Sequence, residues 1–148
     1  MILDFLLQFV AAGLGTVAFS ILFFVPAKYY PICGVIGGSG WLICLTLNRY
    51  LGLGIEVSSF AATAFVIMCS RIAATKQKCP ATLFLISGIF PLVPGTGIYW
   101  TVYYMIMGEM DKCSQYGRQT LTVAIAIVLG IIFVFEIPNS LIRKICRK

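Results

Sequence analysis

Residues 90–97, with the sequence FPLVPGTG, have the residue types best suited to binding chemistry in this chain. Pro91 and Pro94 each lack a backbone donor and clash with the preceding turn, so we expect them to break a helix here. A new helical segment would begin near Gly95, and its first N–H groups and positive dipole end would be free to bind an anion. Glycine at positions 95 and 97 permits close approach of a ligand carboxylate. The pattern predicts a substrate site, with a purely structural kink as the alternative.

Four further side chains are candidates for the same site or for coupling a proton to it. Tyr99 shares a helix face with Tyr103, so the two rings could line a path or form an interfacial aromatic belt. Glu56 is either a proton-coupling carboxylate or a solvated acid at a helix start. Ser39 and Ser59 are small hydroxyl side chains within apolar segments. The predicted substrate-binding residues are therefore Pro91, Pro94, Gly95, Thr96, Gly97, Tyr99, Ser39 and Ser59.

The residue patterns of catalysis and metal binding are absent from the sequence. It contains no histidine, and none of its six cysteines form a C-x-x-C pair, which argues against zinc and thiol redox chemistry. Neither the G-x-S-x-G nor the H-E-x-x-H pattern occurs. We therefore expect no enzyme activity, no catalytic residue, no metal site and no cofactor. The net charge of +6 arises beside apolar segments, so we interpret it as a sign of membrane topology rather than of nucleic-acid binding.

These candidate residues lie in a chain with the composition of a membrane protein. Of its 148 residues, 60% are hydrophobic and 11% are charged, with a mean hydropathy of +0.99, whereas soluble domains carry about 25% charged residues. This excludes a soluble enzyme, a disordered chain and a disulfide-stapled secreted domain. Since about 20 apolar residues cross a bilayer as a helix, we expect an all-α polytopic protein with about five transmembrane helices in one domain, residues 1–148. The expected spans are about 3–25, 30–47, 55–74, 82–107 and 119–137, with the fourth broken in mid-membrane and a polar loop at 109–118.

The second expected span is rich in small residues that have two possible uses. Gly34 and Gly38 form a G-x-x-x-G pair, a pattern that lets another helix approach closely in a membrane. The same face could instead form a thin backbone wall along a substrate path. The sequence leaves both interpretations open.

The basic residues predict how the chain is oriented. With the N-terminus outside, the inner face would hold eight basic residues: Lys28, Arg71, Lys76, Lys78, Arg143, Lys144, Arg147 and Lys148. The outer face would hold three: Arg49, Lys112 and Arg118. Because cytoplasmic loops carry an excess of lysine and arginine, we expect a multi-pass protein of the cell (inner) membrane, with the N-terminus outside and the C-terminus cytoplasmic. Asp4 is the only early charge, so we expect the first segment to be a retained span.

Several short motifs resemble those of the threonine/serine exporter family. They are LGIE at 53–56, Ser58 to Phe60, FPLVPG at 90–95 and Tyr99. The break motif is the most specific of them. In length and span order, the chain is most similar to the small, second-domain subunit of two-component members, including the small subunit of bacterial succinate exporters.

This resemblance implies a function and a partner. The chain would be a membrane subunit of a secondary exporter of small carboxylate-bearing metabolites, either threonine and serine or a dicarboxylate such as succinate. It would work in the lipid bilayer with a larger membrane subunit of the same family. The family's proline–glycine motif would fall on Pro91, Pro94 and Gly95, and its acidic residue on Glu56. The alternatives are a structural or assembly subunit without its own pathway and a homo-oligomeric channel.

Overall fold

A computed structural model describes residues 2–138 and residue 142 of the chain. Within these residues, every regular element is helical, which confirms the all-α prediction. The long elements are α1 (Ile2–Leu22), α2 (Tyr30–Arg49), α3 (Ile55–Gln77), α4 (Thr82–Ile89), α5 (Gly95–Ile106) and α6 (Met110–Phe135). Two short 3₁₀ turns, η1 (Ala27–Tyr29) and η2 (Phe90–Leu92), precede α2 and follow α4.

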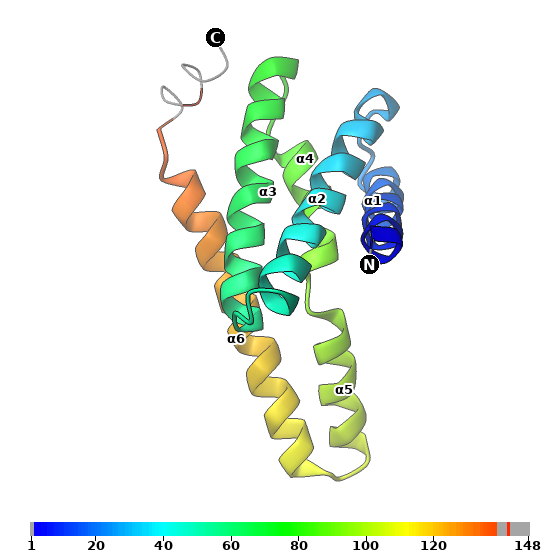
Figure 1. Cartoon of the computed structure of the whole chain (residues 1–148), viewed down its shortest axis with the longest axis vertical. Helices are drawn as coiled ribbons and strands as arrows, with labels where there is room; N and C mark the ends of the chain where they lie inside the picture. Colours follow the sequence, from blue (N-terminus) through cyan, green and yellow to red (C-terminus); the bar gives the residue numbers. More distant parts are fainter. Residues whose placement is uncertain (1, 139–141, 143–148) are drawn as a thin grey trace.

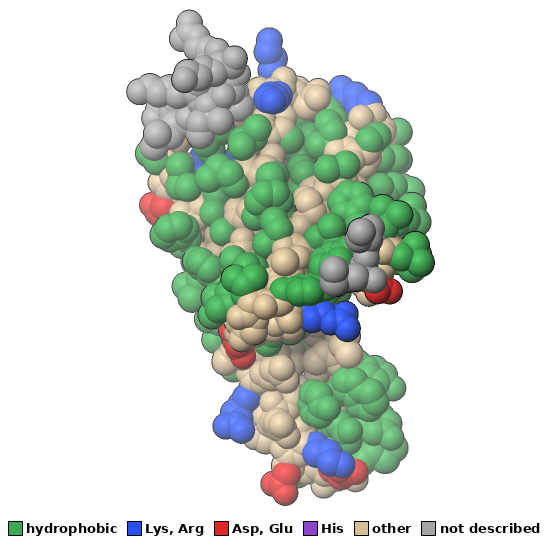
Figure 2. Space-filling model, in the orientation of Figure 1, with side chains coloured by type: hydrophobic (Ala, Val, Ile, Leu, Met, Phe, Trp, Pro, Cys, Tyr) green, Lys and Arg blue, Asp and Glu red, His purple; other side chains and the backbone are tan. Residues whose placement is uncertain are grey.

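The helices are those of a multi-pass membrane protein. Four segments are long and apolar enough to cross a bilayer: Leu3–Leu22, Ala27–Arg49, Ile55–Gln77 and Met110–Phe135. A fifth crossing results if Thr82–Leu92 and Gly95–Ile106, which meet at a 50° bend, count as one span. Hydrophobic side chains are spread over the body of the molecule, and several Lys and Arg side chains lie at its upper edge (Figure 2).

Glycines on α2 bring α1 into close contact. A Cβ atom at Gly37 would lie 2.0 Å from Thr16 Oγ1, and one at Gly38 would lie 2.9 Å from the Phe9 ring. A Cβ at Gly34 would lie 3.4 Å from the Gly13 carbonyl oxygen. The glycine-rich face of the second span is therefore a packing surface against α1, which decides between the two interpretations above.

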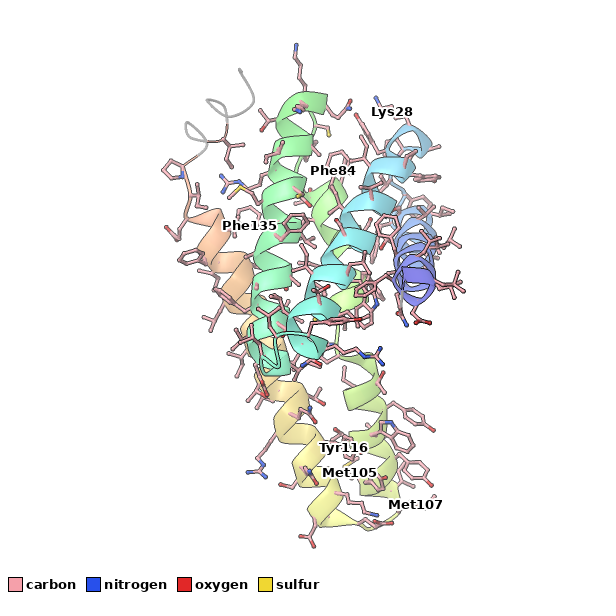
Figure 3. The ribbon with its side chains drawn as sticks, viewed as in Figure 1. Lys28, Phe84, Met105, Met107, Tyr116 and Phe135 are labelled. Atoms are coloured by element: carbon pink, nitrogen blue, oxygen red, sulfur yellow. The ribbon has the colours of Figure 1, made fainter. Side chains whose placement is uncertain are left out.

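The core lies where α4 enters between α2 and α3. Phe84 is fully buried, and its ring meets the edge of Tyr29 at 5.3 Å between centroids. Val66 on α3 is also fully buried, and it occupies the space that a side chain at Gly40 would need, 2.3 Å from that Cβ position. Figure 3 shows Phe84 on α4, behind α2 and α3. This packing fixes the half of the broken span that precedes the proline motif.

The helix α6 is held against α3 along one face. A Cβ at Gly130 would lie 3.0 Å from the Phe60 carbonyl oxygen and 3.1 Å from Thr63 Cβ. Thr63 is fully buried there, and its hydroxyl has no hydrogen-bond partner among the described residues. At the end of α6, buried Arg71 donates hydrogen bonds to the carbonyls of Val134 and Ile137, the latter at 2.7 Å. The Val134 carbonyl also accepts the Ile137 N–H at 3.2 Å, so Arg71 adds a second bond there and gives the Ile137 carbonyl, just beyond the helix end, a donor.

The prediction of a polar loop at residues 109–118 is wrong, because the chain is helical from Met110 onward. The turn between α5 and α6 is made by Gly108, whose φ is +76°. Lys112 bonds to Glu109 at 2.6 Å across the first turn of α6. Charged residues indicate contact with water, but they are compatible with a helix that is exposed. The α5–α6 hairpin consequently extends beyond the ends of α2 and α3 (Figure 1).

Some of the described basic residues lie at the opposite end of the molecule, whereas Lys112 and Arg118 lie on α6 in the hairpin. Lys28 lies in η1 before α2, and Lys76 lies in the last turn of α3. Because α2 and α3 run in opposite directions, these two positions share one end (Figure 1). The four basic residues of the tail, Arg143, Lys144, Arg147 and Lys148, lie outside the described residues.

Candidate functional site

The proline motif breaks the fourth span as predicted. After η2, Val93 adopts an extended conformation with φ −62° and ψ 129°. Pro94 follows with φ −77° and ψ 55°, and α5 begins at Gly95. Proline restricts the residue before it to extended angles, which accounts for Val93. The chain therefore leaves helical geometry for two residues and resumes it in a new direction.

The first turn of α5 has unpaired backbone donors. The Gly95 N–H donates to the Val93 carbonyl at 2.7 Å, and the Ile98 N–H donates to the Pro94 carbonyl at 3.1 Å. Between them, the N–H groups of Thr96 and Gly97 have no acceptor within the described part of the chain, and no side chain caps the helix. Two donors at the positive end of a 12-residue helix are thus available for a ligand.

A cavity of about 340 Å³ lies at this break. It brings together six of the eight residues predicted to bind substrate: Ser59, Pro91, Pro94, Gly95, Thr96 and Gly97. Ser59 comes from α3, and the other five come from the break and the start of α5. Residues separated by more than thirty positions therefore meet around one cavity.

Tyr99, Ser39 and Glu56 lie outside this cavity lining. The Tyr99 side chain is 60% exposed and stacks on Tyr103, with ring centroids 6.2 Å apart. The Ser39 hydroxyl donates to the Ile36 carbonyl within α2 at 3.0 Å. Glu56 accepts a long hydrogen bond of 3.5 Å from Thr122 on α6. Their proposed roles in binding and proton coupling remain predictions.

The structure adds lining residues that the sequence did not suggest. The principal ones are Trp41, Cys44, Trp100, Tyr116, Gln119 and Thr120. The Cys44 Sγ lies 3.9 Å from the Ser59 hydroxyl. Thr120 lies against Gly97, where a Cβ would be 2.3 Å from its Oγ1. Tyr116 points from α6 toward α5 (Figure 3), and its ring stacks on Tyr104 at 5.4 Å.

The lining offers neutral hydrogen-bonding groups and aromatic rings. No charged side chain is among the described residues that line the cavity. Among all the described residues, no group of three or more His, Cys, Asp or Glu side chains could hold a metal ion. A larger recess of about 910 Å³ lies beside Arg71 and Lys78, but it contains none of the predicted site residues. An anion in the smaller cavity would therefore be recognised by the amides of α5 rather than by a cationic side chain.

The cavity lies toward one end of α2 and α3, and the mid-membrane position of the break stays a prediction. Its residues on α3 are Ile55 and Ser59, in the first two turns of that helix, and Cys44 is near the end of α2. The motif divides residues 82–107 near the middle, and α5 then projects past α2 and α3 together with the first part of α6 (Figure 1). The break thus lies close to one surface of the bundle.

Comparisons with known proteins agree with this architecture. A family model described as "Threonine/Serine exporter, ThrE" matches residues 8–137. A probable threonine/serine exporter of Mycobacterium tuberculosis (strain ATCC 25618 / H37Rv) is 22% identical over 124 residues, which cover 80% of this chain and 23% of the relative. The chain thus spans about a quarter of the length of that curated relative. No solved structure matches the chain. Since the family match covers nearly the whole chain, the chain belongs to the threonine/serine exporter family.

Proposed function

We propose that this chain is the small, second-domain membrane subunit of a two-component secondary exporter of small carboxylate-bearing metabolites. The substrates would be threonine and serine, or a dicarboxylate such as succinate. Family membership supports membrane transport. The relative from Mycobacterium tuberculosis is far longer than its matching part, since 23% of it is covered. That difference supports a larger companion subunit that supplies the remaining part of the exporter.

The observation that carries the proposal is the cavity at the broken span with its two unpaired amides. A carboxylate placed there would accept hydrogen bonds from the N–H groups of Thr96 and Gly97. Hydrogen bonds to an ionised acceptor are about twice as strong as neutral ones. The helix dipole adds about 0.3–1 kcal/mol for a charge at an exposed helix end. Carriers use the same device when half-helices point their N-termini at anionic substrate groups.

We place the chain in the cell inner membrane with its N-terminus outside. Lys28 and Lys76 lie at one end of the molecule, and the positive-inside rule assigns that end to the cytoplasm. The cavity then lies near the outer surface, and the α5–α6 hairpin is outermost. Glu56 is the candidate for proton coupling, since its position one turn before Ser59 places it close to the cavity level.

The amide hypothesis can be tested by deleting a single backbone donor. Thr96→Pro removes the N–H at the second position of α5, and proline is tolerated in the first turn of a helix. Thr96→Ala changes the side chain at the same place but keeps the N–H. Both are expressed, with the companion subunit, in a strain that lacks its own exporters. We expect Thr96→Pro to abolish export of the carboxylate substrate while Thr96→Ala retains it, with the subunit complex intact in both.

The alternative functions give different results in this experiment. A structural or assembly subunit would lose export only together with binding of its companion. A homo-oligomeric channel would pass substrate in liposomes without any companion. Equal export by Thr96→Pro and Thr96→Ala would contradict the proposed binding of a carboxylate by these amides.

A further inference from the structure

The cavity is bounded on its α2 side by Trp41, and this side chain is anchored by α1. The Trp41 Nε1–H donates a hydrogen bond to Gln8 Oε1 at 2.9 Å. Gln8 is the one polar side chain between positions 5 and 15 of the sequence. A single polar residue in an otherwise apolar stretch of a membrane helix therefore contacts a wall of the candidate substrate site.

The close packing of α1 on α2 is what brings Gln8 within reach. Phe9, the next residue, lies against Gly38, where a Cβ would be 2.9 Å from the Phe9 ring and 3.0 Å from the Phe9 carbonyl oxygen. Gly38 precedes Trp41 by three residues, which is about one helical turn. A side chain at Gly38 would push α1 away and separate Gln8 from Trp41. The glycine face and the hydrogen bond are thus parts of one arrangement.

The bond determines which part of the indole faces the cavity. Tryptophan has one side-chain donor and no conventional acceptor. Because Gln8 accepts that donor, the Trp41 side chain has no N–H left for a ligand and can offer only its apolar ring to the cavity that it lines. A rigid aromatic wall does not bind one end of a substrate specifically, but it does limit the size of what fits beside the α5 amides.

We propose that Trp41 determines the size of the carboxylates that the cavity accepts, and that Gln8 is a positioning residue that holds the indole in place. This inference rests on the proposed function, because it concerns the same cavity. It assigns to α1 a role in substrate selection, although Gln8 itself does not line the cavity.

The first test measures export of a series of carboxylates of increasing side-chain size. Each added methylene in a close-fitting pocket changes discrimination by about tenfold or more. Trp41→Ala is therefore expected to raise export of the bulky members relative to the small ones by about tenfold or more. Gln8→Met removes the acceptor and is expected to shift the preference in the same direction, whereas Gln8→Glu keeps an acceptor and should preserve it. Thr46→Val is the matched control, since it removes a side-chain hydrogen bond within α2 that lies away from the cavity.

The second test observes the indole directly and does not require transport. The chain has two tryptophans, Trp41 and Trp100, so the Trp100→Phe chain reports on Trp41 alone. We expect Gln8→Met to shift the emission maximum of Trp41 and to raise its quenching by acrylamide. In Gln8→Glu, both properties should stay close to those of the parent.

The outcomes separate this inference from the proposed function. If Trp41→Ala and Gln8→Met export with an unchanged size preference, the role of Trp41 is refuted and the exporter proposal stands. An unchanged emission in Gln8→Met would refute the positioning role of Gln8. If Thr96→Pro exports as well as Thr96→Ala, the substrate site itself is refuted, whatever the result at Trp41.

Discussion

Adding one methyl group at Gly97 should separate α5 from α6 and disable the cavity. The Cβ of Gly97→Ala would lie 2.3 Å from Thr120 Oγ1 and 3.3 Å from Thr120 Cβ. The first distance is about 1 Å short of the 3.4 Å at which ordinary contact begins. Either the first turn of α5 moves away by about this amount, or the Thr120 hydroxyl turns and loses its 2.7 Å bond to the Tyr116 carbonyl.

The expected loss of export follows from these two structural responses, a shift of α5 or the loss of the Thr120 hydrogen bond. Forcing an extra methyl group into a packed contact costs about 1–3 kcal/mol, and losing the hydroxyl bond costs about 0.5–1.5 kcal/mol. A displacement of about 1 Å in a positioning element can lower a rate by about 100-fold. Because α5 carries the amides of Thr96 and Gly97, we expect carboxylate export by Gly97→Ala to fall by about fivefold to 100-fold.

The assay is the initial rate of export, with the thermal stability of the purified protein measured in parallel. Gly117→Ala is the control, because it lies at the same contact between α5 and α6, outside the cavity lining, and a Cβ there would meet Thr101 Cγ2 at an ordinary 3.4 Å. The double variant Gly97→Ala with Thr120→Ala removes the clashing atom and should recover most of the lost activity. Contacting residues usually show coupling of about 0.5–3 kcal/mol in such a cycle. Equal rates for Gly97→Ala and Gly117→Ala, or no recovery in the double variant, would refute the reasoning.

Three further variants test the fold and its orientation. Arg71→Met removes two buried hydrogen bonds at the end of α6 and takes the side-chain donor away from the Ile137 carbonyl, so thermal unfolding in detergent should show a loss of about 1–3 kcal/mol; a melting temperature equal to that of the parent would contradict this. Gly40→Ala places a Cβ 2.3 Å from Val66 and should lower the melting temperature, while Gly15→Ala, which meets nothing within 4 Å, should not. In a chain without other cysteines, Lys76→Cys should react with an impermeant maleimide only from the cytoplasmic side, and labelling of intact cells from outside would reverse the proposed orientation.

The break and the new helix start could be predicted because proline acts on its immediate neighbours. The constraint at Pro94 involves only its own ring and the preceding residue, so the sequence contains all of the information. The prediction that glycines 95 and 97 leave the backbone accessible also used a local rule, but at Gly97 the space that a side chain would need is occupied by Thr120. Local rules of this kind also identify the apolar segments, and hence the helical class of the protein.

The α6 side of the cavity could not be predicted in the same way. Thr120 faces Gly97 because of how the turn at Gly108 directs α6 back along α5, and no local pattern encodes that direction. The choice of Tyr99 illustrates the same difficulty. Successive residues of a helix are about 100° apart, so Trp100 and not Tyr99 lies near the Gly97 face. Which face of α5 meets α6 becomes clear only from the packing.

The close contact between Gly130 and α3 is a point about which α6 could tilt. Gly130 contributes no side chain to this contact, and the adjoining Thr63 hydroxyl makes no bond across it within the described residues. Thr120 is ten residues away, about 15 Å along a helix, so a tilt of about 10° at Gly130 would carry it about 3 Å sideways. Since Thr120 forms one side of the cavity at the break, a slight rocking motion deep in the bundle would be amplified into a change of cavity width at the surface.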